Sequence, residues 1–130
     1  MQIGKTRVRQ HVNPLRREYQ VPAGPLDWSR AFADPTLPLV LDLGCGPGRF
    51  LMLLHKRREE QPAGEGQQQP ACNYLGIEIR EKLVERANEW VARLGFQDSV
   101  HYAYSNATIS LASMMANYPG KITRYLMRVL

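Results

Sequence analysis

Apolar residues along the chain follow two different periods, one typical of buried strands and one of helices. The apolar run over residues 39–43, interrupted only by Asp42, predicts a strand buried on both faces of a parallel sheet. Residues 73–79 and 99–104 predict two more strands. A fourth strand could start within residues 122–130. Each of the first three strands is followed by a segment with a helical pattern.

The clearest helix is expected over residues 80–94, where apolar side chains recur at i, i+3 and i+4 and Gly95 stands at the C-cap position. Residues 49–60 and 110–118 predict the other two helices, the second of them stopped by Pro119. Alternating strands and helices predict an α/β fold, here part of a Rossmann-like, doubly wound parallel sheet with right-handed crossovers.

The chain divides by composition into an N-terminal extension over residues 1–38 and a domain over residues 39–130. The extension is basic, and its prolines predict extended backbone over residues 21–28. Within the domain, residues 61–71 are rich in Gln, Gly and Pro and predict a flexible surface loop.

Charge and composition narrow the class of protein. The net charge of +5 is concentrated at the two ends of the chain, which makes the ends candidates for phosphate contact, although solvated tails fit the composition equally well. No apolar run approaches the ~20 residues that span a bilayer, and the N-terminus lacks a signal-like apolar region. Cys45 and Cys72 form neither a metal-type pair nor a disulfide framework, so we expect an intracellular protein without a metal.

A glycine-rich turn joins the first predicted strand to the first predicted helix. Gly44, Gly46 and Gly48 permit a tight turn and a close approach of a ligand to the backbone. Their GxGxG spacing departs from the GxGxxG of dinucleotide sites, and Asp42 precedes them. An acid followed by this spacing is typical of methyltransferases that bind S-adenosylmethionine, because a carboxylate disfavours phosphate and suits an ammonium group. Asp42 could instead cap the turn.

Two further polar residues stand at the carboxyl ends of predicted strands. Glu78 ends the second strand, where an acid commonly binds the ribose hydroxyls of a nucleotide, or it could simply pair with Arg80. Asn106 follows the third strand, where it could bond the adenine edge or cap the next helix.

These residues belong to longer stretches that resemble one family. The stretches are RVRQHVNPL from Arg7, LDLGCGPGRFL from Leu41, NYLGIEIREKLVERANEWV from Asn73, SNAT from Ser105 and YPG from Tyr118. Together they resemble the tRNA (guanine-N7-)-methyltransferases, a family of class I S-adenosylmethionine-dependent enzymes, with phrasing closest to plant or algal members.

The resemblance implies S-adenosylmethionine as cofactor and methyl transfer to N7 of a variable-loop guanine in tRNA, with a non-catalytic subunit as a further possible partner. It implies cofactor contacts at Gly44, Glu78, Arg80, Asn106 and Ala107. A basic N-terminal segment lies near the tRNA in this family, which makes Arg7, Arg9 and His11 candidates for RNA binding.

One departure from the family pattern limits these expectations. After YPG, family members continue into a strand that ends in a Pro-Asp-Pro-His-type motif with the catalytic aspartate, whereas this chain reads KITRYLMRVL. No catalytic residue is therefore assigned, and we expect an N-terminal portion of such an enzyme that is inactive alone. The alternative is a non-catalytic fragment that binds cofactor or RNA and associates with another chain.

Overall fold

A computed structural model describes residue 13, residues 23–61 and residues 70–127. The RNA-binding candidates Arg7, Arg9 and His11 lie outside these residues, and so does most of the Gln-rich loop. The predictions on both segments therefore stay predictions.

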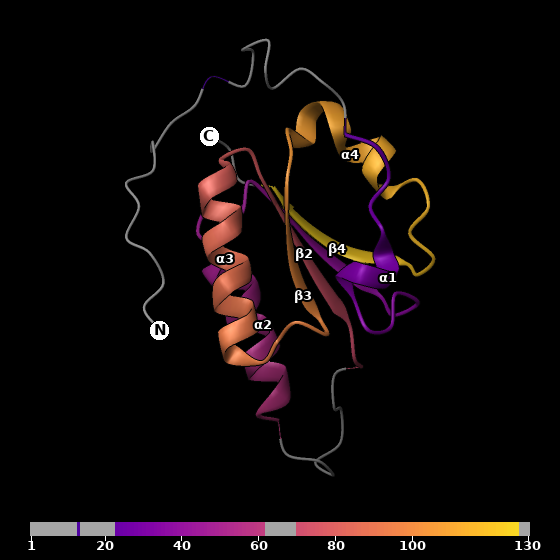
Figure 1. Cartoon of the computed structure of the whole chain (residues 1–130). Helices are drawn as coiled ribbons and strands as arrows, with labels where there is room; N and C mark the ends of the chain where they lie inside the picture. The colour runs from indigo at the N-terminus through magenta and orange to yellow at the C-terminus, as the bar shows by residue number, and fades with distance from the viewer. Residues whose placement is uncertain (1–12, 14–22, 62–69, 128–130) are drawn as a thin grey trace.

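Within the described residues, four parallel strands form one sheet in the spatial order β3-β2-β1-β4 (Figure 1). They are β1 (Leu39–Leu43), β2 (Asn73–Glu78), β3 (Val100–Tyr104) and β4 (Ile122–Met127). The first coincides with its prediction, and the others differ by one residue or a few at their ends. Strands β2 and β3 are added in turn on one side of β1, whereas β4 pairs with β1 on its other side.

In the part of the chain that the structure describes, four helices cover the two faces of this sheet (Figure 1). They are α1 (Trp28–Ala31), α2 (Arg49–Glu59), α3 (Glu81–Leu94) and α4 (Ala107–Met115). One apolar core joins the sheet to α1 and α4, and a second joins it to α2 and α3. Strand β1 supplies both, since Leu41 packs in the first and Val40 in the second. The predicted α/β architecture, a doubly wound parallel sheet, is confirmed.

Helix α1 was not predicted, because the prolines before it favour extended backbone. The side chain of Trp28 is nevertheless buried in the first core and donates from Nε1 to Asn117 Oδ1 at 2.9 Å. The N–H of Ala23 donates to Ser110 Oγ at 2.8 Å. Residues 23–38 thus pack directly on the sheet unit, and the division of the chain at residue 39 stays a prediction about composition.

Helix α4 begins and ends three residues before its predicted limits. Asn106 caps it, since its side chain accepts the N–H of Thr108 at 3.2 Å. Tyr118 falls at helical spacing in the sequence but lies beyond the helix, where its hydroxyl donates to the carbonyl of Leu37 and accepts from Asn73 Nδ2. The YPG stretch therefore anchors the loop before β1.

Asn88 on α3 binds the outer edge of β3. Its Nδ2 donates to the Tyr102 carbonyl at 2.9 Å, and its Oδ1 accepts the Tyr102 N–H at 3.0 Å. Strand β3 stands at the end of the sheet, so these two backbone groups have no strand partner among the described residues. One side-chain amide thus substitutes for a neighbouring strand at this point.

Replacement of Asn88 by alanine is expected to lower the free energy of unfolding by about 1–3 kcal/mol, because it leaves two backbone groups of Tyr102 without their partner. Urea unfolding at neutral pH measures the change. Gln97→Ala, at an exposed position after α3, is the control. Equal stability of the two variants would contradict a structural role for the Asn88 amide.

Two histidines give the fold a predicted sensitivity to acid. Burial lowers the pKa of both His55 and His101 below the ordinary value of 6.5, an effect that Glu59 partly opposes at His55. The unfolded chain then binds more protons than the folded one, so stability falls as the pH drops through 6.5. We expect urea unfolding at pH 7.5 and 5.5 to show this loss. The double variant His55→Leu, His101→Leu should lose most of the dependence, and an unchanged slope would contradict the assignment.

Candidate cofactor-binding site

The glycine turn lies at the carboxyl end of β1 and is fastened to the end of β2. The N–H groups of Gly44 and Cys45 both donate to the carbonyl of Ile77, at 2.8 and 3.2 Å. Gly44, Gly46 and Gly48 have φ angles of 72°, 57° and 81°, in the left-handed region that glycine adopts without steric cost. The three-glycine pattern is therefore required by the backbone of the turn itself.

Tyr102 supports this turn from below, and sequence reasoning missed it. Its hydroxyl donates to the carbonyl of Gly48, and its ring lies against both Gly48 and Gly76, where a Cβ would clash with it. Burial, with Cys45 and Asp42 nearby, raises the pKa of the Tyr102 hydroxyl far above its usual range, so the group remains a donor. Gly76, a glycine inside a buried strand, was the available signal of such a close approach.

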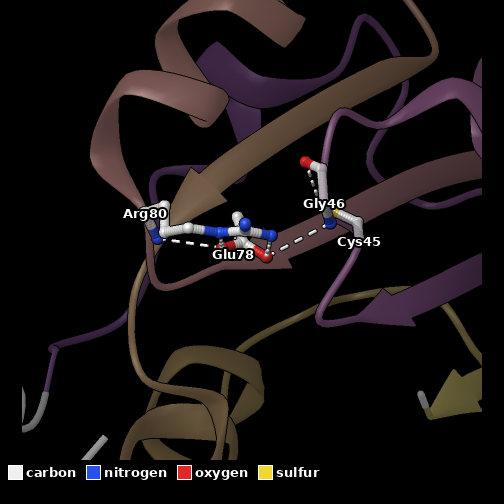
Figure 2. Close-up of polar contacts among 4 residues, drawn as sticks. All are labelled: Cys45, Gly46, Glu78 and Arg80. Carbon is white, nitrogen blue, oxygen red and sulfur yellow. Dashed lines mark hydrogen bonds and ion pairs between the residues drawn. The ribbon is translucent and has the colours of Figure 1, made fainter. Parts of the chain in front are cut away.

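Glu78 reaches from the end of β2 into the glycine turn (Figure 2). Its side chain is only 3% exposed, and its Oε1 accepts the N–H of Gly46 at 3.2 Å. The other oxygen, Oε2, accepts from the backbone N–H of Arg80 at 2.9 Å and from Arg80 Nε at 2.8 Å. A carboxylate is thus held at the mouth of the turn by a backbone amide and a guanidinium.

The Arg80 guanidinium also covers the turn. Its Nη2 lies 3.4 Å from Glu78 Oε1, and it is the nearest group to the position that a Cβ on Gly46 would occupy, at 3.9 Å. The pairing of Glu78 with Arg80, left open by the sequence, is therefore present. It stabilises the buried charge of Glu78, and any ligand hydroxyl that binds this carboxylate has to share it with Arg80 or displace it.

Asp42 is placed differently from Glu78. It is fully buried on β1 and alternates with Leu41 and Leu43, so its side chain is directed to the face that α2 and α3 cover. Its carboxylate contributes to the raised pKa of Tyr102. Asp42 therefore lies beneath the turn, and its predicted contact with the cofactor stays a prediction.

Asn106 and Ala107 lie at the start of α4, next to the end of β2. The N–H of Ser105 donates to the carbonyl of Glu78 at 3.1 Å, which brings the ends of β2 and β3 together. Asn106 is largely buried and serves as the N-cap, the second of its two proposed roles. The carboxyl ends of three adjacent strands thus gather the glycine turn, Glu78 and Asn106 at one edge of the sheet.

Two absences hold for residues 13, 23–61 and 70–127. No cluster of three or more His, Cys, Asp or Glu side chains there could hold a metal ion. None of the helices in these ranges has the length and apolar character needed to cross a membrane.

Comparison with known proteins shows the family to which the chain belongs. Residues 39–113, more than half of the chain, match the family model described as a methyltransferase domain, and the chain belongs to that family. It is similar to proteins named tRNA (guanine-N(7)-)-methyltransferase. One from Synechococcus sp. (strain JA-2-3B'a(2-13)) is 45% identical over 118 residues, which are 91% of this chain and 44% of that protein.

A second relative with the same name comes from Nostoc sp. (strain PCC 7120 / SAG 25.82 / UTEX 2576). It is 43% identical over 113 residues, or 87% of this chain and 46% of the relative. A third, from Synechocystis sp. (strain ATCC 27184 / PCC 6803 / Kazusa), is 39% identical over 123 residues. These residues are 94% of this chain and 52% of the relative. The chain therefore spans about half the length of the curated relatives it matches.

Proposed function

We propose that this chain binds S-adenosylmethionine at the glycine turn and forms the cofactor-binding part of a tRNA (guanine-N7-)-methyltransferase. The observation that carries the proposal is the buried carboxylate of Glu78, held at the mouth of a turn that three left-handed glycines form. The names of the relatives favour this function over a non-catalytic binding fragment.

The described residues fit the proposed cofactor. Glu78 offers two acceptor oxygens to a pair of ribose hydroxyls, and apart from the chain neighbours only Arg80 Nη2 lies within 4 Å of the position that a Cβ on Gly46 would occupy. The position of Asn106 and Ala107 at the start of α4, beside the ends of β2 and β3, supports a contact with the adenine edge. The cofactor itself would supply an electrophilic methyl group on sulfur.

The proposed acceptor atom needs no general base to activate it. N7 of guanine has a free lone pair, so it can attack the methyl group in line without first losing a proton. The task of the protein is to hold donor and acceptor in position, a contribution that can reach ~7–11 kcal/mol. On this proposal Glu78 and the glycine turn fix the donor, and the acceptor is tRNA.

Calorimetry with S-adenosylmethionine tests the cofactor part directly. We expect saturable binding by this chain, with one site. Absence of heat at millimolar ligand, from a sample whose folded state circular dichroism confirms, would reject the site. Transfer of labelled methyl to unmodified tRNA, with the full-length Synechococcus relative as the positive control, tests the acceptor.

A further inference from the structure

The glycine turn is bonded to two neighbouring strands of the sheet. At its start and middle it is bonded to β2, through the carbonyl of Ile77 and through Glu78, whose Oε1 accepts the N–H of Gly46 (Figure 2). At its end it is bonded to β3, because the hydroxyl of Tyr102 donates to the carbonyl of Gly48. The bond to β3 comes from a side-chain hydroxyl, which a substitution can remove without changing the backbone.

Tyr102 is itself held firmly in place. Its side chain is 1% exposed in the second core, and its ring lies against Gly48 and Gly76 so closely that neither could carry a Cβ. Its backbone N–H and carbonyl are both bonded to the amide of Asn88, at 3.0 and 2.9 Å. The hydroxyl is therefore a donor of fixed position, and it determines where the carbonyl of Gly48 lies.

Gly48 joins the turn to helix α2. It is the N-cap residue of that helix, and as a glycine it has no side chain to bond the first turn. Glycine loses more backbone freedom on ordering than any other residue, so a glycine turn needs contacts from outside to stay in one conformation. A ligand that binds an already ordered turn avoids the entropic cost of ordering it.

We propose that Tyr102 is a positioning residue of the cofactor site, whose hydroxyl holds the glycine turn in its binding conformation before S-adenosylmethionine arrives. The inference rests on the proposed function for the identity of the ligand. Tyr102 lies beneath the turn and acts through the backbone of Gly48. A hydroxyl that served only the core would change the global stability and leave the affinity of the folded protein unaltered.

The test uses Tyr102→Phe in the full chain, which keeps the ring and removes the hydroxyl. We expect the Kd for S-adenosylmethionine to rise about five- to tenfold in titration calorimetry, because one hydrogen bond that orders the turn is lost. Hydrogen exchange followed by NMR should accelerate about fivefold at the amides of Gly46 and Gly48. Exchange at the amides of α4 should stay unchanged, which shows that the effect is local to the turn.

Tyr74→Phe is the matched control. Tyr74 is 4% exposed in the same core, but it lies at the amino end of β2, whereas the turn is bonded to the carboxyl end. The same chemical change there removes a buried hydroxyl away from the site, so affinity and turn exchange should keep their wild-type values. Equal loss of affinity in both variants, or wild-type affinity in folded Tyr102→Phe, would overturn the proposal.

Failure of the proposed function would give a different result. If the wild-type chain bound no S-adenosylmethionine, calorimetry would reject the cofactor site, and exchange at Gly48 would still measure how firmly the turn is held. Faster exchange in Tyr102→Phe than in Tyr74→Phe would then support the role of the hydroxyl in positioning the turn. Equal exchange in the two variants would overturn that role, whatever the ligand.

Discussion

Replacing Glu78 by glutamine is expected to weaken S-adenosylmethionine binding about 100-fold. Two hydrogen bonds from ribose hydroxyls to a charged acceptor contribute roughly 1.5–3 kcal/mol each, and about 1.4 kcal/mol corresponds to a tenfold change in affinity. The amide also withdraws one acceptor and leaves the Arg80 guanidinium, which bonds Glu78 at 2.8 Å, without its counter-charge. Titration calorimetry measures the affinity.

The matched control is Glu85→Gln, on the exposed side of α3. Both variants carry the same change of charge, so long-range electrostatic effects are comparable. Thermal unfolding of each establishes that the folded state persists at the temperature of the titration. Wild-type affinity in a folded Glu78→Gln variant would remove Glu78 from the site.

Replacing Gly48 by alanine is expected to lower the free energy of unfolding by about 2–5 kcal/mol. The left-handed φ of 81° costs a residue with a Cβ about 1–2 kcal/mol, and overpacking adds about 1–3 kcal/mol. The overpacking arises because the new Cβ would lie 2.6 Å from two ring carbons of Tyr102, which the second core holds in place. Urea unfolding measures the loss.

Alanine variants at two other glycines separate the backbone cost from the cost of overpacking. Gly95 has a φ of 76° but no atom within 4 Å of its Cβ position, so Gly95→Ala should lose only the backbone part, about 1–2 kcal/mol. Gly24 has neither feature, and Gly24→Ala should change stability by less than about 0.5 kcal/mol. If the losses for Gly48 and Gly95 were equal, contact with Tyr102 would not contribute.

The fold was predictable from sequence because local patterns and tertiary packing agree over most of the domain. Three sequence features each predict a single kind of structure: the apolar run of β1, the amphipathic pattern of α3 and the glycine at the C-cap of α3. Helix α1 was missed because Trp28 is helical through packing on α4, against the preference of the neighbouring prolines. The limits of α4 were shifted because Tyr118 has helical spacing but is held by Leu37 and Asn73, which are distant in sequence.

The sequence predicts which candidate residues meet at this edge of the sheet, but not how their side chains contact one another. Glycines and an acid at strand ends make Glu78 a candidate site residue, since parallel strands bring their carboxyl ends to one edge. Sequence left open whether Arg80 pairs with Glu78, because that depends on side-chain conformation. Tyr102 could not be assigned, because its contact with the turn spans 54 positions of the chain and follows no local pattern.

The amide of Asn88 affects which edge of the sheet can bond a further strand. It occupies backbone groups in the middle of the β3 edge, where another strand would otherwise bond. Among the described residues, the two edge strands therefore differ: a side chain bonds part of the β3 edge, whereas no strand pairs with the outer edge of β4. Within the residues that the structure describes, a further strand could therefore be added more readily at β4 than at β3.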